Sequence, residues 1–469
     1  MLFNTFNFWI IFPFIFTLYW IIPSQLNLIK KIFLIVISYL LYINYNAPYA
    51  FVLLYITLIT YGSAKIIEQT NYKRQLLIII AAILTLGPLL IFKYYNFISE
   101  NCNSILSSFG LKFNLSGLNW AIPLGISFFT FQAIGYLWDV YYKRIKPEES
   151  FIDYMLFISF FPQIASGPIS KASELLPQIK QIKKFNYNQA VKGLQLLLWG
   201  MFLKVVIADR LGLYVDTVYN NYMHQSGITC LVASLFYSIQ IYGDFAGYSL
   251  MAIGIAKTLG FNLINNFQRP YFSISVTDFW RRWHISLSRW LKDYIYIPMG
   301  GSRCSRLRNY WNILITFLIS GIWHGANWNF IIWGILHGIF QILEKAIGLQ
   351  KYTGNSKFIK VIRIGVTFIL VNFAWIFFKT PSLNDACNII IKIFTEFNGS
   401  IYQTSKTNVL LYLIGILVLL FKDIKDEFYD KQFTFWNRKE IKWIIYLILF
   451  AMIIGIGVLD SGQFIYANF

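Results

Sequence analysis

Charged side chains are scarce in this sequence, and their scarcity excludes most soluble folds. Asp, Glu, Lys and Arg make up 13% of the 469 residues, whereas soluble domains carry about 25%. Hydrophobic residues make up 57% of the chain and aromatic residues 19%. Water is therefore not the main solvent of this chain, and the composition predicts an all-α, polytopic integral membrane protein.

Cysteine and histidine are also rare. The four cysteines, Cys102, Cys230, Cys304 and Cys387, lie far apart without a C-x-x-C pair, so they predict neither a disulfide framework nor a zinc site. The four histidines have no partner at i+3 or i+4 and no H-E-x-x-H pattern. We therefore predict no metal site.

Internal repeats and low-complexity linkers are missing as well. No period of 20 to 50 residues recurs, which argues against a repeat architecture. The paired broken helices typical of many transporters are not visible either. The prediction is a single helical membrane domain over residues 1–469.

Long apolar runs, by contrast, are abundant. About 20 apolar residues span a bilayer core, and several runs here are shorter, as in re-entrant segments buried in protein. We expect about eleven transmembrane helices, together with re-entrant or interfacial helices. The first 23 residues lack a basic leader and a cleavage site, so we interpret them as a retained first span. Candidate spans are Phe6–Ile22, Ile32–Tyr45, Pro48–Tyr61, Leu76–Phe92, Ile152–Ile164, Leu194–Ile207, Ile228–Tyr242, Val361–Phe378, Val409–Phe421 and Ile444–Val458.

Positive charge dominates among the few charged residues: 40 Lys and Arg oppose 21 Asp and Glu. In a membrane protein this excess indicates cytoplasmic loops that contact anionic membrane lipids, and we predict no nucleic-acid partner. Two basic clusters separated by a single span cannot both face the cytoplasm. The clusters are Lys143–Lys146, Lys171–Lys192, Arg269–Arg308 and Lys345–Arg363.

The cluster Arg269–Arg308 is the richest and alternates arginines with Trp, Phe and Tyr. This pattern is typical of a helix in the headgroup plane. Alternatively, the arginines bind an anionic acyl donor such as the phosphates of coenzyme A. Arg281 and Arg282 are the candidate donor-binding residues.

Residues Asn309–Leu343 contain no Asp, Glu, Lys or Arg over 35 residues. A straight helix of that length would measure about 52 Å, which exceeds one bilayer core, so it must bend or break. We expect the break at Gly321–Asn329 (GIWHGANWN), because glycines weaken a helix and an asparagine such as Asn327 can satisfy freed backbone groups. This places His324 at the hinge, packed by Trp323. An ionisable group within an apolar stretch indicates a functional site.

A buried imidazole at residue 324 suits a general base that takes a proton from an acceptor hydroxyl. The alternative is a histidine that only packs between helices. His284, beside Asp278, is a second candidate for proton transfer or donor orientation. His337 lies 13 residues beyond His324 and shares a face with it only if the backbone breaks between them.

Six ordered blocks resemble the signature of the membrane-bound O-acyltransferase family, and specifically its alginate O-acetyltransferase branch. Together they cover roughly residues 120–345. The blocks are PLGISFFTFQ (123–132), FFPQIASGP (160–168), YGDFAGYS (242–249), TDFWRRWHISLS (277–288), DYIYIPMGG (293–301) and GIWHGANW (321–328).

The resemblance implies a funnel through the membrane, an acyl thioester donor on the cytoplasmic side, His324 as the catalytic histidine and His284 as the second one. It further implies transfer of an acetyl group to an extracytoplasmic cell-envelope polysaccharide, with an esterase-like extracytoplasmic transferase as partner. Acetyl-CoA would be a substrate, with no bound cofactor, and the location would be the bacterial plasma (inner) membrane. Two alternatives remain: D-alanyl transfer to teichoic acids from an acyl carrier protein, and transport of a lipid-linked sugar without chemistry.

Overall fold

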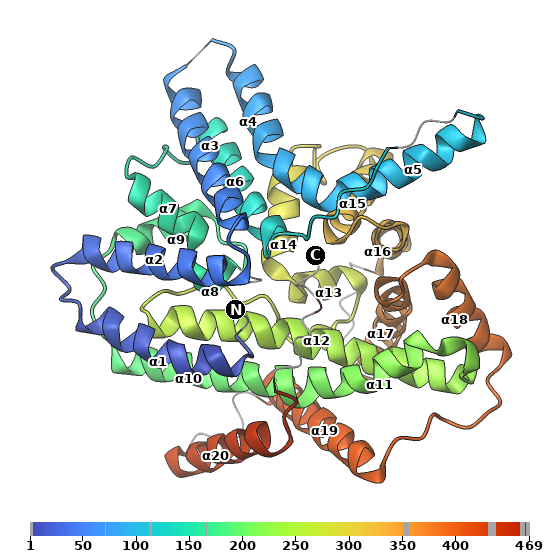
Figure 1. Cartoon of the computed structure of the whole chain (residues 1–469). Helices are drawn as coiled ribbons and strands as arrows, with labels where there is room; N and C mark the ends of the chain where they lie inside the picture. The colour runs from blue at the N-terminus through green and yellow to red at the C-terminus, as the bar shows by residue number, and fades with distance from the viewer. Residues whose placement is uncertain are drawn as a thin grey trace.

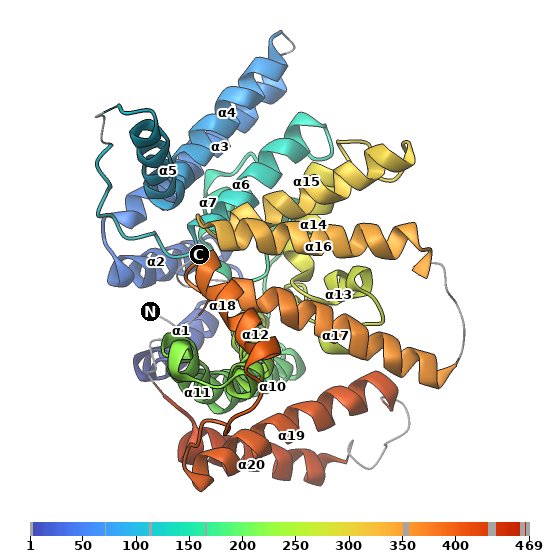
Figure 2. The same ribbon diagram turned by 90° about the vertical axis from the view of Figure 1, so that its right-hand side faces the viewer.

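The computed structural model describes residues 3–70, 72–111, 115–164, 167–349, 356–429, 438–459 and 465. Every regular element in these ranges is helical (Figures 1 and 2). The α-helices are α1 (Phe6–Ile21), α2 (Asn27–Tyr45), α3 (Tyr49–Gln69), α4 (Arg74–Leu89), α5 (Tyr95–Ser108), α6 (Ile126–Tyr141), α7 (Phe151–Ser159), α8 (Phe161–Ile164), α9 (Ala172–Lys180), α10 (Tyr187–Met201), α11 (Asp209–Asn220), α12 (Gly227–Thr258), α13 (Val276–Arg282), α14 (Ile285–Leu291), α15 (Arg306–His324), α16 (Trp328–Ala346), α17 (Lys357–Lys379), α18 (Leu383–Thr395), α19 (Lys406–Phe428) and α20 (Lys439–Ile456).

The all-α prediction is confirmed, and each of the ten predicted spans falls on helical segments. Two of the spans continue through π-helical turns, η1 (Leu90–Tyr94) and η2 (Phe202–Ala208). Seven helical stretches in the described residues are long and apolar enough to cross a bilayer. The shorter apolar helices Phe6–Ile21 and Phe151–Ile164 add to them. The total of about eleven stays a prediction.

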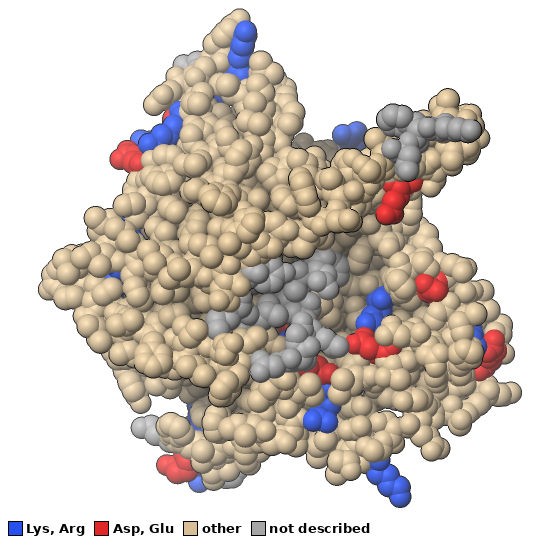
Figure 3. Space-filling view, in the orientation of Figure 1, with Lys and Arg blue, Asp and Glu red and all other residues tan. Residues whose placement is uncertain are grey.

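Large apolar side chains cover much of the outer surface. Phe51, Ile83, Val361 and Leu417 are 74%, 62%, 67% and 62% exposed, and they come from four different helices. On the face in Figure 3, charged side chains are few. Exposed apolar surface on this scale is not tolerated in water, so these helices present it to lipid.

Helix α6 lies at the centre of the fold, although its sequence was not among the predicted spans. Almost all of its side chains are buried, including Ser127, Thr130 and Gln132. Gly125 precedes the helix with φ +69°, a left-handed conformation that glycine adopts without strain. Because it is packed on all sides by protein, α6 accepts polar residues that a lipid-facing helix would exclude.

Helices α10 and α12 cross closely at paired glycines (Figure 1). A Cβ atom on Gly193 would lie 2.7 Å from the carbonyl oxygen of Gly254, and one on Gly200 would lie 2.6 Å from that of Gly247. Small residues at seven-residue spacing on both helices thus permit backbone contact, the usual way in which helices pack within lipid.

The basic clusters meet on one face of the molecule, which we call the basic face. Lys180 is 2.9 Å from Glu148, and this contact raises the pKa of Lys180. Lys171 pairs with Asp293. Arg363 donates to the carbonyl oxygen of Ile274 (3.0 Å). Arg144 lies 5.8 Å from the ring centroid of Tyr294. Together these contacts connect all four clusters.

Two features of the backbone explain how four clusters share one side. Helices α7 and α8, between the first and second clusters, are short and separated at Phe160. Between the third and fourth clusters, α15 and α16 form a hairpin that returns the chain to its starting side (Figure 2). Both arrangements let neighbouring clusters obey the positive-inside bias.

Candidate active site

The predicted break in the charge-free stretch is confirmed. Helix α15 ends at His324, Gly325 is extended, and α16 begins at Trp328. Asn327 caps α16 by accepting a hydrogen bond from the backbone N–H of Asn329 (3.0 Å), and its amide donates to the carbonyl oxygen of Pro381 (2.9 Å). At the end of α15, the carbonyl oxygen of Ile322 accepts from the hydroxyl of Tyr94 (2.7 Å), so the break is supported on both sides by side chains, as helix ends inside a protein require.

Two glycines hold the arms of this hairpin together. A Cβ atom on Gly321 would lie 2.2 Å from the carbonyl oxygen of Phe330, and one on Gly334 would lie 2.3 Å from that of Phe317. Any larger residue would push α15 and α16 apart. The close packing brings His324 against Trp333 of α16, with ring centroids 4.9 Å apart.

His284 occupies the junction between α13 and α14. Its φ is +43°, a left-handed conformation that is strained for a residue with a Cβ atom. Asn266 holds the following turn: its carbonyl oxygen accepts from the N–H of Ile285 (3.0 Å), and its Oδ1 accepts from that of Ser286 (3.1 Å). Strain of this kind concentrates at functional sites.

The fold brings His284 and His324 together from segments 40 residues apart in the sequence. Both side chains are fully buried, and their ring centroids are 6.4 Å apart. Trp323 touches both, with centroid distances of 4.9 Å to His324 and 5.8 Å to His284. Phe128 of α6 lies beside His284 at 6.3 Å. The predicted packing role of Trp323 thus extends to both histidines.

His337 joins the same aromatic cluster. The break gives α16 its own orientation, and Trp333 lies between His324 and His337, with centroids 4.9 Å from each. The indole N–H of Trp280 donates to Nδ1 of His337 (3.2 Å). Since one ring separates His337 from His324, the arrangement favours a supporting role.

Lys93 is a neighbour of this site that the sequence did not reveal. Its side chain is buried, its Nζ donates to the carbonyl oxygen of Trp323 (2.5 Å) and to Oγ of Ser127 (3.1 Å), and it lies 5.6 Å from the centroid of the Trp323 ring. The lysine is in η1, just after Pro88. It thus ties the end of α15 to α6 beside the histidines.

The candidate donor-binding arginines lie elsewhere. Asp278 pairs with Arg282 (3.2 Å) rather than acting beside His284, and Arg282 also pairs with Glu427 of α19 (3.0 Å). Arg281 is exposed. Neither arginine is among the residues that line the two cavities described below, and their role in donor binding stays a prediction.

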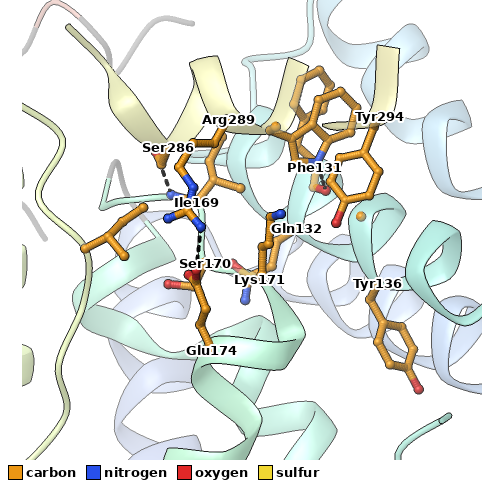
Figure 4. A pocket seen from close by; sticks show the side chains of 13 residues that line it. Phe131, Gln132, Tyr136, Ile169, Ser170, Lys171, Glu174, Ser286, Arg289 and Tyr294 are labelled. Atoms are coloured by element: carbon orange, nitrogen blue, oxygen red, sulfur yellow. Dashed lines mark hydrogen bonds and ion pairs between the residues drawn. The ribbon is translucent and has the colours of Figure 1, made fainter. Parts of the chain in front are cut away.

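A narrow cavity lies between α6, α9 and α14 (Figure 4). It is bordered by Lys171, Glu174 and Arg289, and its volume of about 10 Å³ is close to that of one water molecule. Arg289 pairs with Glu174 (2.7 Å). The indole N–H of Trp290 closes the inner end by donating to the carbonyl oxygen of Phe131 (2.8 Å).

A series of contacting aromatic rings lies between this cavity and His324. Trp290 stacks on Phe131 with centroids 3.9 Å apart, Phe131 lies 5.5 Å from Trp323, and Trp323 lies 4.9 Å from His324. Packed aromatic side chains therefore fill the space between the charged rim and the imidazole. Arg289 belonged to the predicted basic cluster but was not among the predicted donor-binding residues.

The structure thus places two buried imidazoles at a helix break within an apolar part of the chain, where ionisable side chains are usually functional. The family model for membrane-bound O-acyltransferases matches residues 142–383, and the chain belongs to this family. It is therefore a multi-pass membrane acyltransferase. This activity excludes the alternative of a lipid-linked sugar transporter without chemistry.

Three curated relatives are similar to this chain over more than half of its length. The chain is 38% identical over 391 residues to the peptidoglycan O-acetyltransferase of Helicobacter pylori, covering 77% of this chain and 73% of the relative. It is 32% identical over 470 residues to the probable alginate O-acetylase AlgI of Pseudomonas putida, covering 94% of each. The teichoic acid D-alanyltransferase of Bacillus subtilis is 27% identical over 269 residues, 55% of this chain and 68% of the relative.

Proposed function

We propose that this protein is an O-acetyltransferase of the plasma (inner) membrane that moves acetyl groups from cytoplasmic acetyl-CoA toward an extracytoplasmic cell-envelope polysaccharide. The proposal rests on one observation: His284 and His324 lie close together in one buried aromatic cluster at the α15–α16 break. The names of two relatives, a peptidoglycan O-acetyltransferase and an alginate O-acetylase, support the class of substrate.

In the proposed reaction, His324 takes the proton of an acceptor hydroxyl as its oxygen attacks the thioester carbonyl carbon. The new C–O bond replaces the C–S bond, and the departing thiolate receives the proton from the imidazolium. Acyl ester and free thiol are the products. His284 orients the reactants, and the aromatic walls keep out water that would hydrolyse the thioester.

The narrow cavity under Arg289 is the proposed path of the donor's thiol arm. Arginine and lysine at its rim match the phosphates of coenzyme A, because charge-assisted hydrogen bonds to phosphate are strong. Arg289 and Lys171 are currently paired with Glu174 and Asp293. Donor phosphates would replace these carboxylates as the rim opens.

A polymer acceptor is too large to reach His324, because this side chain is fully buried within the aromatic cluster. The attacking hydroxyl therefore belongs to a slender group, and we propose that an esterase-like extracytoplasmic transferase supplies it and passes the acetyl group on. This relay separates the thioester chemistry within the membrane from the polymer outside.

The test is transfer of radiolabelled acetyl from acetyl-CoA in proteoliposomes, with envelope polymers and the extracytoplasmic fraction of the source cells as acceptors. His324→Ala is compared with wild type at matched folding. His224→Ala is the control, because His224 is exposed on the loop before α12. Label that is lost only in His324→Ala supports the proposal, and equal labelling by both variants refutes it.

The teichoic acid D-alanyltransferase likeness keeps carrier-fed transfer as a second candidate. It predicts no labelling from acetyl-CoA and labelling from a D-alanyl carrier protein in the same proteoliposomes. The two donors are therefore offered separately, each with wild type and His324→Ala.

A further inference from the structure

A second, much larger cavity lies away from the two histidines. It is enclosed by α10, α12, α19, α20 and the loop 265–269, and its volume is about 960 Å³. This size is at the upper end of ligand sites. In Figure 2, α19 and α20 lie side by side at the bottom, next to α10 and α12. We call this space the α19–α20 cavity.

The α19–α20 cavity is apolar along its length and cationic at one end. Its apolar wall includes Leu203, Leu250, Leu449 and Met452. Its cations lie where helices reach the basic face: early in α10, at the end of α12, in the loop after it and near the end of α19. They are Lys192, Lys257, Arg269, Lys422 and Lys425.

Cations outnumber the carboxylates that line this cavity, Asp423 and Asp426. Asp426 pairs with Lys422 (2.5 Å), Asp423 accepts from the hydroxyl of Tyr242 (3.0 Å), and Glu427 pairs with Arg269 (2.8 Å). Among the residues that the structure describes, no carboxylate lies within ion-pair distance of Lys192, Lys257 or Lys425. The cavity therefore offers positive charge at the depth of lipid headgroups.

Two buried polar atoms in the cavity wall lack hydrogen-bond partners within the described part of the chain. They are Oγ of Ser249 and Nδ2 of Asn266, and each side chain is only 1% exposed. Buried polar groups are normally satisfied. The two atoms have almost no solvent-accessible surface, so they lie just behind the cavity wall, where a ligand reaches them once a neighbouring side chain moves aside.

We propose that the α19–α20 cavity binds one anionic phospholipid, with its phosphate at Lys257 and Lys425, its ester region near Ser249 and Asn266, and its acyl chains along α20. An elongated apolar space with a cationic end matches this chemistry better than that of a polar metabolite. Two of the surrounding helices, α19 and α20, also expose large apolar side chains, among them Leu417 and Leu447.

The bound lipid also bears on the active site through Asn266, and this second step rests on the proposed function. The backbone oxygen and Oδ1 of Asn266 hold the turn after His284, and Asn266 is also one of the residues that line the α19–α20 cavity. A lipid that engages Nδ2 fixes the amide and thereby the turn. Acetyl transfer should then rise with the content of anionic lipid.

The binding experiment uses the full-length protein in phosphatidylcholine nanodiscs that contain a trace of photoactivatable phosphatidylglycerol, with peptide mapping of the crosslinks. Wild type should be labelled on α12, α19 and α20. The double variant Lys257→Gln/Lys425→Gln should lose about tenfold or more of this labelling, since each lysine near a membrane surface contributes about 1 kcal/mol. Ser249→Ala should lower it about twofold or more without altering the charge.

The matched control is Lys146→Gln/Lys184→Gln, which removes two exposed lysines from the basic face away from the cavity. An equal loss in this control, or labelling confined to other helices, overturns the lipid site. Displacement of the label by acetyl-CoA also overturns it, because the cavity would then hold the donor.

A separate activity measurement distinguishes the two steps. Acetyl transfer is compared in nanodiscs with and without phosphatidylglycerol, for wild type and for Lys257→Gln/Lys425→Gln. Stimulation in wild type only supports the link through Asn266. If the lipid crosslinks to the cavity but does not stimulate acetyl transfer, the link through Asn266 is wrong and the lipid site stands. If wild type is crosslinked normally but transfers no acetyl group, the result counts against the proposed function alone.

Discussion

Two fully buried polar clusters in this protein differ in how their charges are balanced. In η2 and its surroundings, the ammonium of Lys204 lies 2.6 Å from a carboxylate oxygen of Asp209 and 2.6 Å from one of Asp244. Around the α15–α16 break, by contrast, His284 and His324 are enclosed mainly by aromatic rings. Opposite charges hold the first cluster together, whereas in the second the imidazoles lie among aromatic rings, with Lys93 as an ionisable neighbour on the backbone of Trp323.

The comparison separates structural from chemical uses of buried polarity. A buried ion pair is strongly destabilised when one partner is removed, because the other charge stays behind. Replacement of a neutral imidazole leaves no buried charge behind, so it affects chemistry more than folding. We therefore expect changes at Lys204 to affect folding and changes at the histidines to affect turnover.

The largest effect is expected for His284→Asn. Asparagine tolerates the left-handed conformation at this position, so the substitution removes the imidazole and spares the backbone. We expect kcat for acetyl transfer to fall about 100-fold or more, the usual contribution of a proton-transfer or orienting group, with an unchanged melting temperature. Turnover in proteoliposomes and thermal unfolding in detergent are the two measurements. Turnover within threefold of wild type would assign His284 to packing.

The opposite pattern is expected for Lys204→Ala. Removal of the ammonium leaves Asp209 and Asp244 buried without their shared cation, which should lower the free energy of unfolding by about 3–5 kcal/mol. Thermal unfolding of the purified protein measures this, and activity should fall only in proportion to the folded fraction. A variant that melts like wild type would show that the ionic cluster is dispensable for stability.

The two clusters also show what sequence can predict. The helix break at residues 325–327 was predictable, because 35 residues without charge exceed a bilayer and glycines mark the weak point. The ten apolar runs were predictable for the same reason. These features depend on neighbours in the sequence.

Long-range partners were not predictable in this way. Lys93 contacts Trp323 across 230 positions, and Arg282 meets Glu427 across 145. A lone lysine at the end of an apolar run is usually a headgroup anchor, and an arginine in a basic cluster usually faces phosphate or solvent. Only the packing of α4 against α6 and of α13 near α19 determines these partners. The pairing of His284 with His324 came from the family resemblance and not from spacing.

An intermediate effect is expected for Lys93→Met. Methionine keeps most of the apolar stem but removes the donor to the carbonyl oxygen of Trp323, which loosens the residue before His324. Since small displacements of catalytic groups slow reactions strongly, we expect kcat to fall about tenfold while the KM for acetyl-CoA stays within twofold. Lys93→Arg should restore part of the rate. The control is Lys146→Met, at an exposed site. A rise in KM without a fall in kcat would contradict a positioning role.

The smallest effect is expected at the rim of the narrow cavity. Arg289→Gln should raise the KM for acetyl-CoA about fivefold with kcat within twofold, because a rim cation contributes to donor binding and not to the chemical step. Arg281→Gln is the matched comparison, since Arg281 belongs to the same basic cluster but does not line this cavity. Initial rates over a range of acetyl-CoA concentrations measure both variants.

The comparison of these two arginines decides where the donor enters. If Arg281→Gln raises KM more than Arg289→Gln does, the donor approaches over the outer side of α13 and the cavity in Figure 4 is not its path. If only Arg289→Gln acts, the route runs between α6, α9 and α14, past the stacked rings of Trp290 and Phe131. In that case Trp290→Ala should widen the passage and let longer acyl thioesters compete with acetyl-CoA, because the indole fills the inner end of the cavity.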